Sequence, residues 1–598
     1  MNVLHHEFSE TSGKMETMTV APAEPVVFDG LAGSFHAARG DTAILLLSPW
    51  GYEELCSRKS YRILGETLAA RGYPTLRFDY PGTGNSAGES AGIEDERSWR
   101  DAVRRAFDEV GKLCTPSRVI VIGQGVGGAL AADLASETDV AGLVLLAPVA
   151  QGRGYLRELT AWTAMTKPTF LVDASDGPQG GLMAGGSVLS AATASEIRSL
   201  NILKAPAPRV SKVLLVERDH HPGDAKLAAN LLEKSVAVDR LPFEGYVDYV
   251  SNPTLSIVPV TTIEAVTSWI ATQFPASATA SAPTQGALPS TLQEADYEQT
   301  LVRFGANGMF FGVFTRALAR PNETAFLFLN SGYDHSVGWG RSTVDFARAL
   351  ASSGVTSLRM DAAGIGESRL WPGQAPQVLY GDRQLDDVKT ALDWLTGTAG
   401  VEKVVLVGRC SGAYLALIAA EADPRVTGLV AINVRRLVWD PDEDVETTLR
   451  EPIQTLDTYR RKMVDKRMLK RLLTGDLPLS RVVTRLASAV SRVLDRKLAP
   501  VLRGASRHYR LNRIVQSRFK ALRERGVPVS LIFCEGDRGV QDVQAWFKED
   551  FSGLAPYENV ELSMIANADH NLTPLASRAE VLELLRGFAS SQRLRARK

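Results

Sequence analysis

The sequence has few cysteines and almost no net charge. The four cysteines lie far apart, with no Cys-x-x-Cys pair and no histidine at metal-ligand spacing. This pattern argues against a disulfide framework and a zinc site, and it fits a reducing compartment. The formal net charge is only −1, so the overall electrostatics do not indicate a nucleic-acid-binding protein. The cysteines are Cys56, Cys114, Cys410 and Cys534.

Long hydrophobic runs are also absent. No apolar run is long enough to span a bilayer, and residues 1–20 lack a basic segment followed by an apolar one. We therefore expect a cytoplasmic protein without a signal peptide or membrane span, and we expect neither a metal ion nor a cofactor. With 598 residues, 45% of them hydrophobic, the chain has an ordinary globular composition and is too long for one core.

The same pattern occurs twice along the chain. In each half an apolar strand leads into a short turn, a helix, a second strand and the motif Asp-x-x-Gly-x-Gly-x-Ser, at residues 79–86 and 361–368. An amphipathic helix and two more apolar strands follow. Strands that are apolar throughout and alternate with helices predict a mostly parallel sheet covered on both faces. The predicted elements are residues 43–47, 61–71, 75–78, 99–113, 118–122 and 141–146, then 325–329, 343–353, 356–360, 384–395, 403–407 and 428–432.

A stretch of small residues and prolines separates the two copies. Residues 275–290 are mostly Ala, Ser, Thr and Pro without periodicity, which is typical of an exposed linker. We therefore predict an α/β protein with two tandem domains, residues 1–274 and residues 291–598. Each domain should be a mostly parallel sheet covered by helices.

A sharp turn around Cys410 is the strongest candidate for a catalytic site. An apolar strand ends at Gly408, Cys410 follows, and Gly412 opens an Ala- and Leu-rich helical pattern. In the serine form of this motif, Gly-x-Ser-x-Gly, the residues two before and two after the nucleophile must be small because the turn is tight. Cys410 meets this requirement, whereas Ser411 as nucleophile would put Arg409 at a position that needs a small residue.

The order of these motifs resembles the α/β-hydrolase superfamily in both halves. Within it, Asn330-Ser331-Gly332 with residues 361–366 is similar to hydrolases of the serine aminopeptidase S33-like group, especially those found beside bacterial exosortase and exopolysaccharide genes. Residues 152–159 of the first half resemble the same group. The resemblance implies two tandem α/β-hydrolase domains, with a lid inserted after the strand that follows the nucleophile.

The resemblance implies the chain order nucleophile, acid, histidine. After Cys410 only His508 and His570 remain. His570 follows the strand-like residues 560–565, at a strand end where such folds place chemistry, whereas His508 lies in an Arg-rich helical segment and is expected at the surface. We therefore assign His570 as the base. Beside this histidine and at a helix N-terminus, the pKa of the Cys410 thiol should fall.

The acid should follow the strand-like residues 527–533. Asp537 fits this position, with Glu535 as the fallback and Asp569 as a weaker substitute. Taken alone, Asp537 could also be a turn former or a helix N-cap.

The oxyanion hole rests on the resemblance alone, because backbone donors are invisible in a sequence. It should combine the N–H of Ser411 with the N–H of Tyr333, from the loop that begins at Gly332. Gly332 and Arg409 are the candidate substrate-binding residues.

The first half lacks two of the three catalytic groups. Its matching turn, residues 123–127, has Gly125 at the apex, which carries no side chain to react. The region that should supply the base, residues 243–249, contains no histidine, and His220 and His221 come one strand too early. We therefore predict a pseudoenzyme domain that serves packing, substrate docking or regulation.

An arginine-rich insertion follows the strand after the nucleophile. Residues 434–525 combine many arginines with apolar residues at helical spacing, which predicts a helical cap. One interpretation is a solvated helical face. The other is recruitment of an anion, such as the phosphates of CoA or phosphopantetheine, an acidic acyl carrier protein or a sugar-linked acidic polymer. No aromatic platform accompanies the arginines, so we expect no nucleic acid.

These observations lead to an enzyme hypothesis and two rivals. We expect an acyl hydrolase or acyltransferase with a Cys410-His570-Asp537 triad, acting through an acyl-cysteine on an acyl thioester of CoA or a carrier protein. The first rival is a carboxylesterase or lactone hydrolase of the dienelactone type. The second is a non-catalytic binding or scaffold protein in which Cys410 is an inert buried residue. The acyl group, the acceptor and the oligomeric state stay open.

Overall fold

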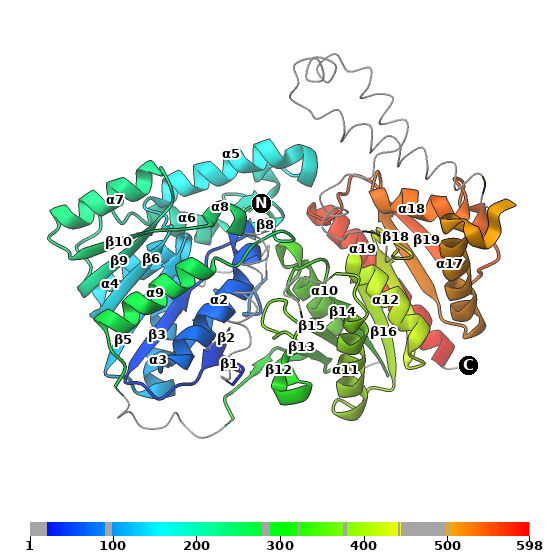
Figure 1. Ribbon diagram of the computed structural model, residues 1–598, viewed down its shortest axis with the longest axis horizontal. Helices are drawn as coiled ribbons and strands as arrows, with labels where there is room; N and C mark the ends of the chain where they lie inside the picture. Colours follow the sequence, from blue (N-terminus) through cyan, green and yellow to red (C-terminus); the bar gives the residue numbers. More distant parts are fainter. Residues whose placement is uncertain are drawn as a thin grey trace, which may run out of the picture.

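The structure is a computed structural model that describes residues 21–89, 98–277, 287–319, 323–374, 379–440 and 501–596, together with Glu443 and Leu498. These residues form two large sheets that lie side by side, each with helices on both faces (Figure 1). The first sheet, blue to green in Figure 1, uses strands between residues 24 and 242, and the second, green to red, uses strands between residues 291 and 565. The predicted fold class, two mostly parallel sheets in tandem, is confirmed.

The first sheet has eight strands in the order β1-β2-β4-β3-β5-β6-β9-β10. Within this order, the strands β4-β3-β5-β6-β9-β10 run parallel to one another. At the edge, β1 pairs antiparallel with β2, and β2 pairs antiparallel with β4. A separate hairpin, β7–β8, follows later in the chain. The strands are β1 (Glu24–Phe28), β2 (Leu31–His36), β3 (Thr42–Leu47), β4 (Thr75–Phe78), β5 (Arg118–Gln124), β6 (Val140–Leu146), β7 (Leu182–Ala184), β8 (Ser187–Leu189), β9 (Val210–Glu217) and β10 (Val238–Pro242).

Helices cover the first sheet on both faces because its central strands are apolar throughout. Helices α2 and α9 pack on one face, and α3, α4 and α7 on the other. The helices are α2 (Tyr52–Ala70), α3 (Trp99–Cys114), α4 (Val126–Glu137), α5 (Gly152–Phe170), α6 (Ala191–Ser199), α7 (Pro222–Glu233), α8 (Tyr246–Tyr249) and α9 (Val260–Gln273).

The second sheet repeats the order of the first, with one strand added at its edge. Its order is β11-β12-β13-β15-β14-β16-β17-β18-β19, and strands from β15 to β19 run parallel. The strands are β11 (Thr291–Gln293), β12 (Tyr297–Phe304), β13 (Phe310–Ala317), β14 (Thr324–Leu329), β15 (Ser357–Asp361), β16 (Lys403–Arg409), β17 (Val426–Ile432), β18 (Val529–Cys534) and β19 (Val560–Ile565).

Helices also cover both faces of the second sheet. Helices α10 and α19 pack on one face, and α11, α12, α17 and α18 on the other. The helices are α10 (Ser342–Ala351), α11 (Arg383–Gly397), α12 (Ser411–Ala422), α17 (Arg507–Glu524), α18 (Arg538–Phe547) and α19 (Leu575–Ala596). None of the helices in the described ranges is long and apolar enough to cross a membrane.

Three features differ from the sequence prediction. Helix α2 begins at Tyr52 instead of residue 61, because its first turns bury charged side chains such as Arg58, which hide the apolar periodicity. The antiparallel strands β1, β2, β12 and β13 are additional. The third difference is α17, which lies inside the predicted cap at residues 434–525 but packs Phe519 into the main core. Most of the remaining cap, residues 444–497, lies outside the described residues.

The two halves contact one another through matching positions of the repeated motif. Arg77 on β4 forms an ion pair with Glu367, and Arg359 on β15, at the same register, donates to Asn85 Oδ1 at 3.0 Å. Asn85 and Glu367 each come six residues after the aspartate of their motif. All four side chains are buried. The interface therefore has an approximate two-fold symmetry and is built largely from charged groups.

Candidate active site

Cys410 lies at the apex of a strained turn between β16 and α12. Its φ of 56° and ψ of −119° lie outside the regions that most side chains adopt. Such a conformation lifts the side chain away from the sheet at the carboxyl end of its central strands, which is the purpose of a nucleophile turn. The backbone at Gly125 in the first half is nearly the same, with φ of 55° and ψ of −122°.

The flanking glycines are required by close backbone contacts. A Cβ atom on Gly408 would lie 2.2 Å from Gly412 O, and a Cβ atom on Gly412 would lie 2.2 Å from Asn330 O. Both distances are far below van der Waals contact, so neither position accepts a side chain without movement of the backbone. The two small residues that flank Cys410 in the sequence are therefore required by this turn.

His570 and Asp537 lie together beside Cys410. His570 Nδ1 is 2.6 Å from Asp537 Oδ2, and the His570 side chain also interacts with the Cys410 thiol. Asp537 follows β18 and caps α18, because its Oδ1 accepts from Gly539 N at 2.7 Å. The second carboxylate oxygen is thereby turned toward the imidazole. The structure brings the three predicted residues of the triad together.

The electrostatics of this group favour a thiolate paired with an imidazolium. Burial alone would raise the pKa of Cys410, but His570, Arg435 and Arg409 outweigh it and lower the pKa from 9.0 to about 7. Burial lowers the pKa of His570, whereas Cys410 and Asp537 raise it by more, so the net pKa lies above its usual range. Burial raises the pKa of Asp537, and His570 brings it below the usual range. The carboxylate therefore stays ionised next to the imidazole.

The alternative acids and the alternative base have other surroundings. Asp569 Oδ1 accepts three hydrogen bonds from Asn571 and Thr573, which makes it a turn former. Glu535 is exposed. The His508 ring stacks on Trp546 at 4.8 Å between centroids, on α17 and not at a strand end.

The predicted oxyanion loop lies against the start of α12. Ser411 is the first residue of α12, so its N–H is one of the first-turn donors that have no acceptor within the helix. Gly332 has a φ of 57° and donates its N–H to Ser411 Oγ at 2.8 Å. The Gly332 N–H is therefore engaged by the protein, and Tyr333 is the next residue along the loop.

Arg409 contacts protein groups and joins two loops of the site. It donates to Asp334 Oδ2 at 2.8 Å, to Asn571 Oδ1 at 2.5 Å and to His570 O at 3.3 Å. Asp334 lies in the predicted oxyanion loop, and His570 and Asn571 lie in the loop after β19. The guanidinium thus connects these two loops in this structure, and its contact with substrate stays a prediction.

Other residues of the site were not predicted from the sequence. Asn433, at the end of β17, donates to His570 O at 3.0 Å and accepts from Cys534 N at 2.8 Å, which fixes two strand ends. The rings of Tyr380 and Trp439 stack at 4.4 Å, and Tyr414 contacts Tyr380 edge-on. Burial and the Cys410 charge raise the pKa of Tyr380. Asn433 has a positive φ, which asparagine tolerates, and the signal available in the sequence was an asparagine directly after an apolar strand.

Two arginines of the predicted cap that the structure describes have acidic partners. Arg507 forms ion pairs with Asp440 and Glu443, and Arg518 Nε lies 2.7 Å from Glu421 Oε2. These two arginines stabilise the packing of α17 and fit the interpretation of a structural helical face. The basic run at residues 460–471 lies outside the described residues.

The apex of the first half is occupied by a carboxylate. A Cβ atom on Gly125 would lie 2.6 Å from Glu53 Oε2, and Glu53 Oε1 accepts from Gln124 Nε2 at 2.8 Å. The position of the missing histidine loop is taken by α8, whose Tyr246 hydroxyl approaches Glu53 Oε1 at 3.5 Å. His220 is 94% exposed. In the described part of the chain, no group of three or more His, Cys, Asp and Glu side chains is arranged to hold a metal ion.

Comparisons with known proteins agree with this architecture. Residues 43–191 match the family described as serine aminopeptidase, S33, and residues 326–584 match the family described as alpha/beta hydrolase. No curated protein matches the chain in a sequence search.

The following solved structures each align with about half of the chain. A serine hydrolase homologue from Coxiella burnetii shares 14% identity over 49% of this chain and 98% of its own, with a TM-score of 0.29. An esterase from Pyrococcus furiosus shares 14% over 49% and 92%, with a TM-score of 0.31. A dienelactone hydrolase from Anabaena variabilis shares 13% over 49% and 97%, with a TM-score of 0.29. From the two family matches, together with the two sheets and their common strand order, the chain belongs to the α/β-hydrolase family and carries two domains of it in tandem.

Proposed function

We propose that the protein is an acyl hydrolase or acyltransferase that forms an acyl-Cys410 intermediate. The observation that carries this proposal is the thiol at the strained turn, with a pKa lowered to about 7 and His570 and Asp537 alongside. A thiol with this pKa is substantially ionised at neutral pH, and the thiolate is the nucleophilic form.

In the first half-reaction the Cys410 thiolate attacks the carbonyl carbon of the substrate. A C–Sγ bond forms, and the carbonyl electron pair moves onto oxygen. The backbone N–H groups of Ser411 and Tyr333 are the proposed donors to this oxyanion. When the intermediate collapses, the bond to the leaving group breaks, and the leaving atom takes the proton of the His570 imidazolium.

In the second half-reaction the acyl group leaves Cys410. Neutral His570 accepts a proton from water or from an acceptor hydroxyl or thiol, whose heteroatom attacks the acyl carbon. The second tetrahedral intermediate expels the Cys410 thiolate, so the pair of thiolate and imidazolium is regenerated. Asp537 orients the ring and stabilises its charge throughout. Water gives a carboxylic acid, and another acceptor gives a transferred acyl group.

An acyl thioester is the favoured substrate because of leaving-group chemistry. The tetrahedral intermediate expels the more stable leaving anion, and the Cys410 thiolate competes with the leaving group of the substrate. A thiol leaving group of pKa about 8.5 competes well with Cys410, whereas an alkoxide competes poorly. CoA and acyl carrier proteins are the common carriers of such thioesters.

The first half has no proposed covalent chemistry. Glu53 fills the space in front of Gly125, and Tyr246 lies where a base would be required. We propose that this half is a pseudoenzyme domain.

The test compares thioesters with oxygen esters of the same acyl groups. Release of free thiol from acyl-CoA and acyl-pantetheine, and of alcohol from matched esters, would be measured for the parent protein, Cys410→Ala and the control Cys114→Ala. We expect turnover in the parent and in Cys114→Ala, faster with thioesters, and none in Cys410→Ala. Faster turnover of oxygen esters or lactones would favour the dienelactone-type alternative. No turnover of either class would favour a binding protein.

A further inference from the structure

The predicted oxyanion loop, residues 330–338, lies directly against the first half. His335 Nε2 is 3.2 Å from Glu54 Oε2 on α2, and the His335 side chain is only 2% exposed. A Cβ atom on Gly332 would lie 3.2 Å from Thr254 Oγ1 of the first half. A cavity between the halves is lined by Tyr333 and His335 on one side and by Cys56 and Pro253 on the other. The loop that precedes the proposed oxyanion donor is therefore backed by the first half.

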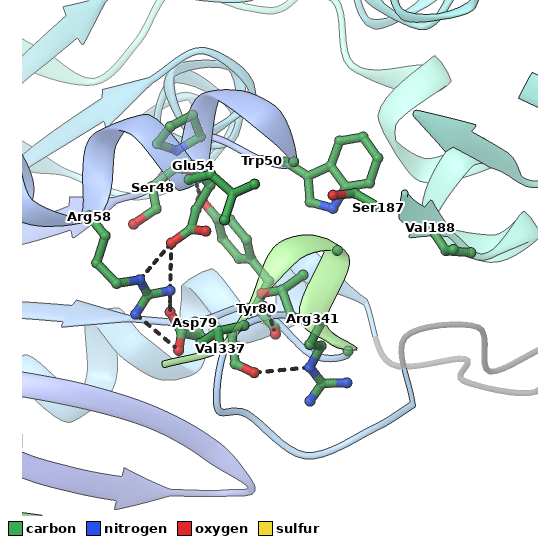
Figure 2. Close-up of a pocket in the computed structure, with 18 of the residues that line it drawn as sticks. Ser48, Trp50, Glu54, Arg58, Asp79, Tyr80, Ser187, Val188, Val337 and Arg341 are labelled. Atoms are coloured by element: carbon green, nitrogen blue, oxygen red, sulfur yellow. Dashed lines mark hydrogen bonds and ion pairs between the residues drawn. The ribbon is translucent and has the colours of Figure 1, made fainter. Parts of the chain in front are cut away.

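Glu54 is itself held in place by buried charges. Arg58 Nε donates to Glu54 Oε1 at 2.6 Å, and Arg58 Nη2 donates to Asp79 Oδ1 at 2.7 Å. Figure 2 shows Arg58 bridging the two carboxylates, with Val337 and Arg341 of the second half across the same pocket. Burial raises the pKa of Glu54, but Arg58 and His335 bring it well below its usual range. The contact with His335 is thus made by an ionised, rigid carboxylate.

A second contact reaches the loop that carries His570. Arg578 on α19 donates from Nε to Leu572 O at 2.8 Å and from Nη2 to Thr573 O at 3.2 Å, next to His570. The same guanidinium donates from Nη2 to Gly186 O at 2.9 Å, in the turn of the first half's β7–β8 hairpin. Its Nη1 also donates to Gly340 O at 2.8 Å.

Gly185, which precedes Gly186 in the same hairpin, also contacts the second half. Gly185 O accepts from Trp339 Nε1 at 2.7 Å. The Trp339 ring packs in an apolar cluster with Leu55, Phe170 and Val188 of the first half. Backbone and side-chain contacts therefore fix the hairpin to the second half.

Arg409 connects the two loops that the first half contacts. It joins Asp334 of the oxyanion loop to His570 O and Asn571, between the two places where the first half makes contact. The path runs from Glu54 through His335, Asp334, Arg409 and the His570 loop to Arg578 and back to Gly186. Buried hydrogen bonds of this kind hold their members in one arrangement.

We infer that the first half positions the active site of the second half, and that Glu54 and the β7–β8 hairpin hold the oxyanion loop and the His570 loop at the distance that catalysis requires. Glu54 and Arg578 are then positioning residues, since they act through the two loops. The inference rests on the proposed roles of Cys410 and His570. It gives the half without a nucleophile a specific task and explains why its contacts converge on the catalytic loops.

The test measures the reactivity of Cys410 in full-length variants. Alkylation of Cys410 by iodoacetamide would be followed by peptide mass spectrometry from pH 5 to pH 9 in Glu54→Ala, Glu54→Gln and Arg578→Lys. We expect alkylation of Glu54→Ala and Arg578→Lys to be slowed about tenfold at neutral pH, with a higher pH midpoint, because the loops shift relative to Cys410. Glu54→Gln should regain part of the rate, since its amide oxygen still accepts from His335 while its NH2 group faces Arg58.

The matched control is Glu137→Ala. Glu137 belongs to the first half and pairs with Arg104 at 2.7 Å on the surface, where the two side chains are 56% and 42% exposed. This variant should keep the parent's rate and midpoint. Amide hydrogen exchange of residues 330–338 and 567–573 measures the mobility of the two loops without any reaction at Cys410. The exchange rate should rise in Glu54→Ala and Arg578→Lys only.

Two results would overturn the inference. One is an unchanged alkylation rate, midpoint and loop exchange in both Glu54→Ala and Arg578→Lys. The other is a loss of rate that follows the folded fraction while the pH midpoint stays that of the parent, which would mean a purely structural role. Failure of the parent to turn over any ester or thioester would contradict the proposed function instead, because alkylation requires no substrate.

Discussion

The charge state of Cys410 follows from its neighbours more than from its burial. Burial by itself opposes ionisation of a thiol, yet an imidazole and two guanidinium groups face it and bring its pKa to about 7. For Cys534, also buried at a strand end, Asn433 and Arg409 do not outweigh burial, which raises its pKa to about 12. The two residues have the same chemistry and differ only in what surrounds them.

The first prediction concerns the pH dependence of this thiol. Because the folded protein lowers the pKa of Cys410 from 9.0 to about 7, the thiolate fraction should rise through about pH 7. Below this pH the thiol is protonated and alkylation should slow tenfold per pH unit. The measurement is the rate of Cys410 alkylation against pH by peptide mass spectrometry.

The control for this profile removes the main cause of the shift. His570→Ala should move the midpoint upward, toward that of an ordinary or buried thiol, since burial then lacks its main opposing charge. Cys534 should stay unmodified over the same range. A midpoint near 9 in the parent protein would contradict the ion pair.

At this scale the sequence indicated the three side chains that the structure brings together, but not the residues that support them. Cys410, Asp537 and His570 were predictable because glycine spacing and chain order mark them. Asp334, Asn433 and Tyr380 were not, because each acts through a partner that is distant in sequence, such as His570 for Asn433, at 137 residues. The N–H groups of Gly332 and Arg409 contact Ser411, Asp334 and the His570 loop, and the contact of these two residues with substrate stays a prediction.

At the scale of elements, the turn from β16 to α12 forms because Gly408 and Gly412 carry no side chains. Gly412 touches the backbone of β14 so closely that the helix could not start there with any larger residue. Because Gly412 lies so close to this backbone, the first N–H groups of α12 face the same space as the Cys410 thiol.

The second prediction tests this close approach. Gly412→Ala should destabilise the protein by about 1–3 kcal/mol, since a Cβ atom 2.2 Å from Asn330 O forces the backbone to shift. Urea unfolding followed by tryptophan fluorescence measures the change. Cys410 alkylation should slow in the same variant.

Gly397→Ala is the matched control for that substitution. Gly397 ends α11, and a Cβ atom there would meet no heavy atom within 4 Å. The free energy of unfolding of Gly397→Ala should stay within about 1 kcal/mol of the parent's, and the higher helix propensity of alanine should tend to raise it. Equal losses in the two variants would contradict the account of the turn.

Helices and strands were predictable where the hydrophobic pattern of the sequence was clear. Central strands such as β3 and β14 match the predicted bounds to within one residue, because they are buried along their whole length and apolar after their first residue. Strands β2, β12 and β13 were missed, since they alternate or carry small and polar residues. The start of α2 was missed because its contacts with the second half are made by charged side chains.

At the scale of the whole molecule, the interface is a buried network of charges. Glu367 of the second half is only 2% exposed and contacts Arg77 and Arg58 of the first half. Burial raises the pKa of Glu367, but the arginines outweigh it and lower the pKa to about 2. Such a network has no stable alternative in separated halves, so the two domains should behave as one unit.

The third prediction concerns this network. Glu367→Ala leaves buried arginines without their counter-charge and should cost about 3–5 kcal/mol of interface stability. The measurement is urea unfolding, in which the variant should separate into two transitions. Replacing both partners by apolar residues, Arg77→Met with Glu367→Leu, should restore most of the loss because no buried charge is left unpaired there.

A surface pair provides the control for the network. Glu298 pairs with Arg316, which is 57% exposed, so Glu298→Ala should change stability by at most about 1 kcal/mol. If Glu367→Ala behaved like Glu298→Ala, the interface would not depend on its buried charges.

The central claim is that Cys410 carries the acyl group during catalysis. The most direct measurement is intact-mass spectrometry of the protein after brief incubation with a panel of acyl-CoA and acyl-carrier thioesters, beside Cys410→Ala and His570→Ala. We expect one acyl adduct on the parent, mapped to Cys410, absent from Cys410→Ala and slow to form in His570→Ala. Thioester turnover by Cys410→Ala, or an adduct on another residue, would contradict the account.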